Sequence, residues 1–390
     1  MSAARHALAW LVAANAVGLW LSLLLLFPEF QVGEWTYGRW VPVHLNGQLY
    51  GWTALPLVGW LLTTYGVRRS WSEAALWAWT AALALGCLAW LMGGSSGKIF
   101  LDWKGGSLRA FVAAMVILWA ALFSGWRQTA GWWRFAGLVG LALVPVGMMF
   151  ASDPKTYPPV DRLTGGPTGA SLLGSTLFVV GLLLVLPRTL LGTWIKGGWV
   201  KKTWWFFGIS WVVAIVGETV GGTHFDWWQV GALALLLPWL WLLPKWWGGY
   251  EWPEDSVWWR RMMWGWWSLL VASGLVAYFP WVLDHLKFTQ GLVAHSHLAM
   301  AGFTSAFGMV LLGLLGLKVG GQASILMWNG AVAVMVLSLM SMGWMEGGDW
   351  SWMGEPPIWR LAGLAVRSAC GAVMLGVSLK WWLESLKEKV

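Results

Sequence analysis

Histidine is the residue type in this chain whose placement most clearly suggests chemistry. Six histidines occur among the 390 residues, and three of them, His44, His295 and His297, lie inside long apolar runs. An ionisable side chain is costly inside a membrane, so such a residue is a functional candidate by default. Imidazole is also a common ligand of haem iron and other metals. These three side chains are therefore the first candidates for a cofactor site.

The spacing of His295 and His297 restricts what they can bind. Positions two apart on an α-helix differ by about 200° of rotation, because an α-helix has 3.6 residues per turn. The two side chains therefore point to nearly opposite faces and cannot both bind one metal ion from the same face. Each can face a different centre, and imidazoles from two separate helices form a bis-histidine haem site.

Glycines accompany these histidines in the sequence. Gly47 and Gly51 follow His44, and Gly302 follows His297, so a flat macrocycle could approach the backbone closely at these positions. The structural alternative is that each histidine only hydrogen-bonds a neighbouring helix. One isolated histidine would favour that alternative, whereas three at one membrane depth favour haem.

Composition identifies the elements that must position the histidines. Apolar residues make up 58% of the chain and charged residues 11%, and the mean hydropathy is +0.62. Soluble domains carry about 25% charged residues, so we exclude a soluble enzyme, a disordered chain and a nucleic-acid-binding protein. The apolar runs are continuous, which predicts helices rather than the alternating strands of a barrel. We expect a polytopic all-α membrane protein in a lipid bilayer.

Cysteine and tryptophan usage adds two expectations. The two cysteines, Cys87 and Cys370, exclude a disulfide scaffold and a cysteine metal cage, and the lack of a CxxCH motif argues against covalently attached haem. The 40 tryptophans stand mainly near the ends of apolar runs, which indicates anchoring at the headgroup level of a membrane.

The apolar runs predict about twelve transmembrane helices in one domain, residues 1–390. A spanning helix needs roughly 17–25 residues, so the fifth and eighth runs are short for a span. No soluble domain and no internal repeat is evident. The predicted spans are Ala7–Phe27, Val41–Leu62, Ala74–Met92, Ala110–Trp126, Phe135–Phe150, Ala170–Leu186, Trp204–Val220, Trp228–Leu243, Met263–Tyr278, Leu292–Leu317, Ile325–Met342 and Leu361–Leu383.

Basic residues predict the orientation of these spans. With twelve spans, the side that holds the N-terminus carries about twice as many Lys and Arg residues as the other side. The positive-inside rule makes that side cytoplasmic, so both termini are expected inside. The second and tenth spans then run from outside to inside, and His44, His295 and His297 all lie within one or two helical turns of the outer surface.

Two segments resemble a known family. HLNGQLYGW, from His44 to Trp52, and AHSHLAMAGF, from Ala294 to Phe303, are similar to segments of the main subunit of haem-copper oxidases and nitric oxide reductases. The cbb3-like and nitric-oxide-reductase branches resemble them most. The resemblance extends to the topology of the whole chain, and it implies a bacterial-type inner membrane. It also implies that His44 and His297 hold a low-spin haem b, and that His295 faces the position of a second, high-spin haem.

The chain departs from this family at the copper site. The family places one histidine in its sixth span and two in its seventh, whereas Ala170–Leu186 and Trp204–Val220 contain none. No cysteine or paired carboxylate replaces them. Copper is therefore not expected, and with it the usual basis for reducing O2 or coupling two NO molecules is missing.

Two arginines near the outer end of the last span are candidate partners of haem propionates. Arg360 precedes this span and Arg367 lies about two turns inside it. A buried guanidinium needs an anion, and its planar fork suits a carboxylate. The alternative is an ion pair within the protein, with Glu218, Asp349 or Glu355 as the partner.

These observations predict a haem b-binding electron-transfer subunit without copper. It would pass single electrons between quinol or a periplasmic cytochrome and a partner subunit. Two alternatives stay open: a catalytic O2 or NO reductase, and hence an oxidoreductase, with an unusual second site, and a non-redox or NO-responsive protein in the manner of the NnrS family, with a sensory or vestigial haem. Whether the chain is an enzyme is left open, as is a second haem at His295.

Overall fold

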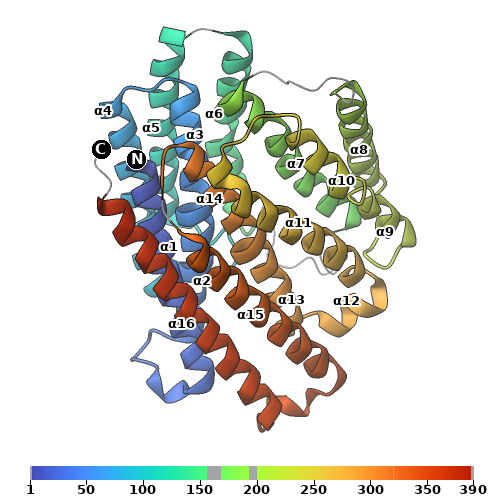
Figure 1. The fold of residues 1–390 in the computed structure, drawn as a ribbon. Helices are drawn as coiled ribbons and strands as arrows, with labels where there is room; N and C mark the ends of the chain where they lie inside the picture. The colour runs from blue at the N-terminus through green and yellow to red at the C-terminus, as the bar shows by residue number, and fades with distance from the viewer. Residues whose placement is uncertain (1, 130, 156–167, 193–199, 319, 388–390) are drawn as a thin grey trace. The chain divides into compact units, whose positions relative to one another are not determined.

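The computed structural model describes residues 2–129, 131–155, 168–192, 200–318 and 320–387. Nearly all of this part of the chain is helical (Figure 1), and the extended structure within it is one isolated bridge between Val32 and Trp35. The all-α fold predicted from the continuous apolar runs is confirmed.

The number of membrane spans is slightly lower than predicted. Among the described residues, ten helices are long and apolar enough to cross a membrane. An eleventh is possible if Glu254–Ala277 and Pro280–Leu286, which meet at a bend of 100°, form one span. The remaining predicted span, Val41–Leu62, lies within an unbroken helical segment from Tyr37 to Thr64, but its polar side chains lower its hydropathy.

The chain divides into two compact units. Unit 1 comprises Met1–Pro159, Phe307–Met335 and Leu361–Val390. Three helices, α14 (Ser305–Leu314), α15 (Gln322–Gly348) and α16 (Ile358–Lys387), have residues in both units. The other elements of unit 1 are α1 (Ser2–Leu26), η1 (Pro28–Phe30), α2 (Tyr37–Asn46), η2 (Gly47–Thr53), α3 (Ala54–Thr64), α4 (Arg69–Leu91), α5 (Gly105–Thr129) and α6 (Trp132–Ser152).

Unit 2 comprises Val160–Ala306 and Val336–Arg360. Pro280 stands at the first residue of its short helix α12, where the missing backbone N–H of proline is tolerated. Its elements are α7 (Gly169–Leu191), α8 (Val200–Val220), α9 (Trp227–Ala234), α10 (Trp239–Trp247), η3 (Glu254–Ser256), α11 (Val257–Ala277), α12 (Pro280–Leu286), α13 (Gln290–His297), η4 (Leu298–Thr304) and η5 (Trp350–Met353).

Tryptophan has a larger structural role than anchoring at the membrane surface. Of the described tryptophans, eight are fully buried, and they include Trp52, Trp103 and Trp328. Others, such as Trp132 and Trp205, are more than two-thirds exposed and fit the predicted anchoring role. The sequence pattern therefore identified one use of this residue type and missed its use as a core residue.

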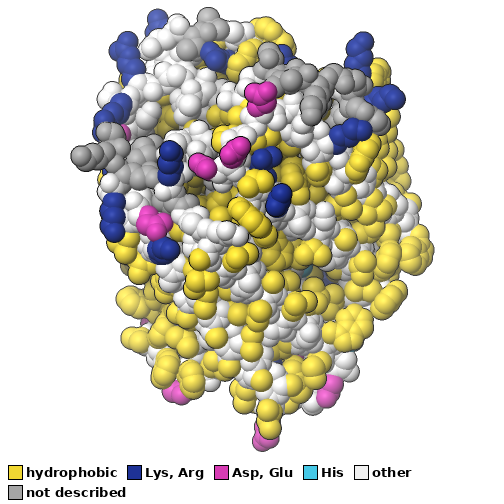
Figure 2. Space-filling view, viewed as in Figure 1, with side chains coloured by type: hydrophobic (Ala, Val, Ile, Leu, Met, Phe, Trp, Pro, Cys, Tyr) yellow, Lys and Arg dark blue, Asp and Glu magenta, His cyan; other side chains and the backbone are white. Residues whose placement is uncertain are grey.

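The first and last helices of unit 1 meet at one end. The Nε atom of Arg5, in the second turn of α1, donates to the carbonyl oxygen of Ser385 near the end of α16 at 3.2 Å. In the space-filling view, hydrophobic side chains cover much of the viewed surface, and Lys and Arg side chains gather in its upper part (Figure 2). This distribution is typical of a membrane-spanning bundle.

Candidate functional site

His44 lies on α2, seven residues after the first residue of this helix. Its Nδ1 atom is 2.8 Å from the carbonyl oxygen of Ala14 on α1. A carbonyl oxygen can only accept, so Nδ1 carries the proton and Nε2 carries the lone pair. The edge of the ring between its two nitrogens packs on Gly18, where a Cβ atom would lie 2.6 Å from Cε1 of His44. The ring is therefore fixed in both tautomer and orientation.

His297 lies on α13, also seven residues after the first residue of its helix. Its Nδ1 atom is 2.8 Å from the carbonyl oxygen of Val293, one turn earlier in the same helix. The same reasoning makes Nδ1 the donor and gives the lone pair to Nε2. His44 belongs to unit 1 and His297 to unit 2, so their pairing on one iron stays a prediction.

His295 faces α11 of unit 2. Its Nδ1 atom is 3.3 Å from the Oγ atom of Ser273, and that hydroxyl lies 3.3 Å from the carbonyl oxygen of Leu270. When the hydroxyl donates to this carbonyl, it accepts from Nδ1 of His295, and Nε2 again carries the lone pair. Cε1 of His295 would lie 3.2 Å from a Cβ atom at Gly274. All three histidines thus favour the tautomer that binds iron through Nε2.

A π-helix follows His44 and His295 in the same register. Each of these wider helical segments has seven residues and begins three residues after the histidine, at Gly47 in η2 and at Leu298 in η4. Each ends in Gly, an aromatic residue and Thr: Gly51-Trp52-Thr53 and Gly302-Phe303-Thr304. Short π-helical insertions are rare and occur often at functional sites. Two π-helices that begin at the same distance from a histidine indicate a structural repeat within the chain.

The helix that packs against each histidine repeats as well. Trp10 on α1 lies against Gly51, and Trp266 on α11 lies against Gly302, where a Cβ atom would be only 2.6 and 2.8 Å from the respective tryptophan. Eight residues after each tryptophan comes the glycine that contacts the histidine ring, Gly18 or Gly274. The carbonyl that holds each imidazole belongs to the residue four positions after the tryptophan, directly for Ala14 and through Ser273 for Leu270.

The ends of the two histidine-bearing helical segments are also alike. Gly66 and Gly316 both have a positive φ, 62° and 93°, and end their helices. The backbone N–H of the following residue, Val67 or Leu317, donates to a carbonyl five residues earlier. Such a cap favours glycine because other residues are strained at a positive φ.

This internal repeat is hardly visible in the sequence. Its trace in the sequence is histidine, six residues, then Gly, an aromatic residue and Thr, together with tryptophan and glycine eight residues apart in the preceding long helix. So few shared positions do not stand out in a chain that is 58% apolar. The repeat becomes visible when the π-helices and the glycine contacts are compared.

Arg360 is ion-paired with a carboxylate that the sequence did not suggest. Its Nε atom is 2.9 Å from Oε1 of Glu346 on α15, and the side chains are 15% and 1% exposed. Oε2 of Glu346 accepts from the backbone N–H of Gln290 at 2.8 Å, at the first residue of α13. A buried carboxylate at a helix N-terminus is favoured by the helix dipole. The pair therefore holds the start of the helix that carries His295 and His297, and the partner is not Glu218, Asp349 or Glu355.

Arg367 is buried in unit 1, with 7% of its surface exposed. It hydrogen-bonds the side chain of Tyr37, the first residue of α2, and it lies within electrostatic range of His44. A buried guanidinium beside a candidate haem ligand is suitably placed for an anionic substituent of the cofactor, which is the role that the sequence predicted.

A buried polar cluster fixes α2 behind His44. Asn46 donates through Nδ2 to Oδ2 of Asp102 and to the carbonyl oxygen of Pro42, both at 2.8 Å, and Ser95 donates to Oδ1 of Asp102 at 2.7 Å. Burial raises the pKa of Asp102, and the hydrogen bonds from Asn46 and Ser95 partly offset this effect. The sequence does not point to Asp102, because this residue stands in a loop whose burial only the tertiary structure reveals.

The other histidines stand apart from the three candidates. His6 is hydrogen-bonded to Thr80 in unit 1, and His285 is hydrogen-bonded to the carbonyl oxygen of Trp344 in unit 2. His224 is buried next to Phe225. In the described part of the chain, no group of three or more His, Cys, Asp or Glu side chains could hold a metal ion. The lack of copper that the sequence predicts concerns the protein in its membrane, and it stays a prediction.

No family model matches the chain, and no curated protein is significantly similar to it.

Proposed function

We propose that the chain is a haem b-binding, electron-transferring membrane subunit, in which His44 and His297 would hold the haem. The observation that carries this proposal is the shared state of their imidazoles. Each Nδ1 donates to a backbone carbonyl at 2.8 Å, so the lone pair is on Nε2. A hydrogen bond from the second ring nitrogen is the usual support of a metal-bound histidine. The residues present therefore fit the group.

The surroundings of His44 suit a macrocycle with acidic substituents. Gly18 leaves room for the imidazole ring, and the guanidinium of Arg367 is nearby for a propionate. Arg360 is the weaker of the two propionate candidates, because Glu346 already neutralises it. The haem would supply a one-electron couple between ferric and ferrous iron, and the chain's residues set its position and its electrostatic surroundings.

The proposed setting is a bacterial-type inner membrane with both termini in the cytoplasm. The bias of Lys and Arg towards one side supports this orientation. The bond between Arg5 and Ser385 agrees with it, because it brings the start of α1 and the end of α16 together at one end of unit 1. The partners would be a membrane or periplasmic cytochrome subunit, with a quinol as a further electron donor.

A second candidate function is the binding of a diatomic gas by a haem on His295. The observation that favours it is the equivalence of His295 and His44, since both precede a π-helix by three residues and both rest on a glycine of the packed helix. A haem held by His295 alone would keep one face open for a ligand. Catalytic reduction of O2 or NO would need this open face.

Spectroscopy of the purified full chain tests the proposal. The protein is purified in detergent from cells supplied with a haem precursor, and its haem and metal contents and reduced-minus-oxidised spectrum are measured. We expect non-covalent haem b with low-spin bands, and loss of these bands in His44→Ala and in His297→Ala. His285→Gln is the matched control and should retain them. A haem-free protein, or unchanged bands in both alanine variants, would refute the assignment.

A further inference from the structure

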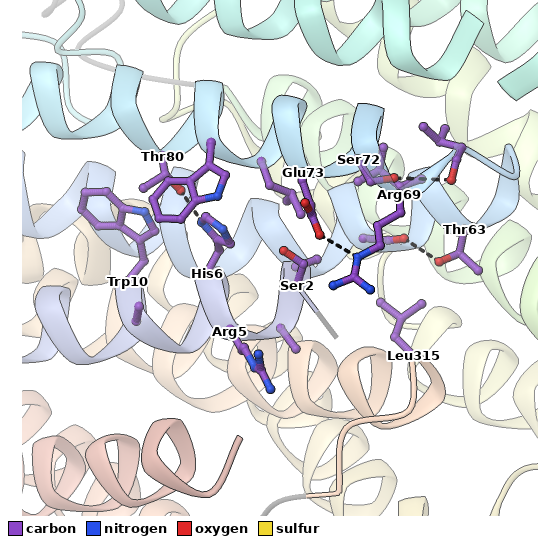
Figure 3. Close-up of a pocket in the computed structure, with 18 of the residues that line it drawn as sticks. Ser2, Arg5, His6, Trp10, Thr63, Arg69, Ser72, Glu73, Thr80 and Leu315 are labelled. Carbon is purple, nitrogen blue, oxygen red and sulfur yellow. Dashed lines mark hydrogen bonds and ion pairs between the residues drawn. The ribbon is translucent and has the colours of Figure 1, made fainter. Parts of the chain in front are cut away.

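A pocket of about 930 Å³ lies within unit 1 between the first halves of α1 and α4 and the end of α3 (Figure 3). Leu315, just after α14, and Trp382 on α16 complete its wall. Sites for small organic ligands have volumes of about 300–1,000 Å³. The pocket is therefore large enough for a ring system with part of a hydrocarbon tail, and it is separate from the proposed haem ligands.

The lining changes from polar to apolar along the two helices. At the starts of α1 and α4 it contains Ser2, Arg5, Arg69 and Glu73, as Figure 3 shows. Two to three turns further along α1 it consists of Ala9, Trp10 and Ala13, and α4 adds Leu76. A ligand that matches this lining has a polar head and an apolar body, and it lies along the two helices.

His6 and Thr80 form a hydrogen-bonding pair inside the pocket. Nδ1 of His6 is 2.7 Å from Oγ1 of Thr80, and the indole of Trp77 packs edge-on against the imidazole with ring centroids 4.7 Å apart. Imidazole can donate or accept a hydrogen bond, and hydroxyl can do both. An oxygen-bearing aromatic ring could thus bond to this pair and stack beside Trp77.

The two arginines of the pocket already have partners within the protein. Nε of Arg69 is 2.8 Å from Oε1 of Glu73, and Nε of Arg5 donates to the carbonyl oxygen of Ser385. A phosphate or a carboxylate would have to compete with these internal partners and would meet the repulsion of Glu73. Carbonyl or hydroxyl oxygens can bond to His6 and Thr80 without disturbing either arginine.

The lining of the pocket includes exposed residues of α1 and α4, and along α1 it extends to the residue before Ala14. Trp77 is 64% exposed, and Ala13 is also exposed, so the gap between α1 and α4 opens laterally. Ala13 directly precedes Ala14, whose carbonyl holds His44, and Trp10 packs on Gly51 of the π-helix after His44. A ligand that reaches Ala13 therefore contacts the residue next to Ala14, whose carbonyl holds the candidate haem ligand.

We propose that this pocket binds the ring of a membrane quinone or quinol, with the isoprenoid tail leaving between α1 and α4. The ring oxygens bond to His6 and Thr80, and Trp10 and Trp77 flank the apolar body. The choice of a redox-active occupant over another neutral amphiphile rests on the proposed haem function. Binding itself requires only the pocket, so it can be measured whether or not haem is present.

The experiment is a binding and labelling study on the full chain in detergent. A short-chain quinone is titrated by equilibrium dialysis, and a photoreactive azidoquinone is cross-linked and mapped by mass spectrometry. We expect labelling on residues 2–13 and 69–80, and binding about tenfold weaker in His6→Ala and in Thr80→Val, since each loses one hydrogen-bond partner. Thr80→Val is nearly isosteric and should not disturb the fold, so weaker binding in this variant cannot be attributed to misfolding.

Trp71→Ala is the matched control for Trp77→Ala on the same helix. Trp71 is 45% exposed and is not part of the pocket wall, so binding should fall in Trp77→Ala and stay at the wild-type value in Trp71→Ala. The proposal would be overturned if the wild type, His6→Ala and Thr80→Val bound the quinone with equal affinity, or if labelling were confined to other segments. It would also be overturned if the pocket held a phospholipid that the quinone does not displace. If a haem-free protein still bound quinone in this pocket, the quinone proposal would stand and the haem assignment would fail.

Discussion

His44 and His295 occupy the same position relative to a π-helix, three residues before its first residue. Each imidazole is bonded through Nδ1 to the carbonyl four residues after a tryptophan, directly at Ala14 or through the hydroxyl of Ser273 at Leu270. Each also rests on a glycine of that helix, Gly18 or Gly274. The chain thus uses one local architecture twice to fix an imidazole, which is more than two isolated structural histidines would require.

Gly18→Ala should disturb the proposed haem site without unfolding the protein. A Cβ atom at this position would lie 2.6 Å from Cε1 of His44, and the bond from Nδ1 to Ala14 prevents the ring from simply turning away. Loss of such orientation typically weakens metal binding by about 10- to 100-fold. We expect low-spin haem content to fall by a similar factor in the spectrum of the purified variant.

Gly376→Ala is the control for this substitution. It lies on α16 of the same unit, and a Cβ atom there would meet nothing within 4 Å. Alanine is favoured over glycine in a helix by about 1 kcal/mol, so this variant should retain its haem and unfold at the same or a higher temperature. Full haem content in Gly18→Ala would mean that the position of the His44 ring does not determine binding.

Ser273→Ala tests whether His295 holds a second, open-sided haem. The substitution removes the hydroxyl between Nδ1 of His295 and the carbonyl of Leu270. We expect weaker CO binding by the reduced protein, with the low-spin bands unchanged. Ser268→Ala, on the same helix, removes a hydroxyl that bonds to Trp264 and should leave CO binding unaltered. Identical CO spectra in both variants would contradict a ligand role for His295.

The sequence predicted most of the helices because apolar runs of this length have few alternatives. It also predicts His44, His295 and His297 as cofactor ligands, since an ionisable residue inside such a run is conspicuous, and that role stays a prediction. The helix with His44 is not among the helices apolar enough to count as a span, and polar residues such as Asn46 and Gln48 stand within it.

Features that depend on tertiary packing were beyond the sequence. Nothing in the local pattern distinguishes the π-helices from regular helix, and the contact of Gly18 with His44 joins residues 26 positions apart. The partner of Arg360 could not be chosen among several carboxylates, because the choice depends on how α15 packs beside residue 360. Asp102 and His6 were passed over for the same reason, since a loop or a terminus shows no sign of its own burial.

Glu346→Ala should destabilise unit 2 substantially. It leaves the guanidinium of Arg360, which is 15% exposed, and the N–H of Gln290 without their carboxylate. Breaking a buried ion pair by removing one partner costs about 3–5 kcal/mol. Thermal unfolding in detergent should show a clear drop in the midpoint temperature.

The exposed pair of Glu34 and Arg39 provides the comparison for Glu346. The side chain of Glu34 is 84% exposed, so Glu34→Ala should change stability by no more than about 1 kcal/mol. Equal effects of the two substitutions would show that Glu346 contributes no more than a surface carboxylate.

Asp102→Asn should remove a dependence of stability on pH. Burial raises the pKa of Asp102 in the folded protein above the value of about 3.9 expected for an unfolded chain. Between these two values the folded state binds more protons than the unfolded state, so stability falls as pH rises through this window. Asparagine does not titrate, so the stability of the wild type relative to the variant should decline with rising pH. If the relative stability of the wild type increased with pH, the folded protein would favour the ionised form of Asp102.

The central claim is that imidazoles of His44 and His297 ligate one haem iron, and electron paramagnetic resonance of the oxidised protein tests it most directly. The proposal predicts a low-spin ferric signal of the bis-imidazole type in the wild type and in His285→Gln. It predicts that this signal is lost, or replaced by a high-spin signal, in both His44→Ala and His297→Ala. A low-spin signal that survives unchanged in either alanine variant, or a wild-type protein without a ferric haem signal, would contradict it.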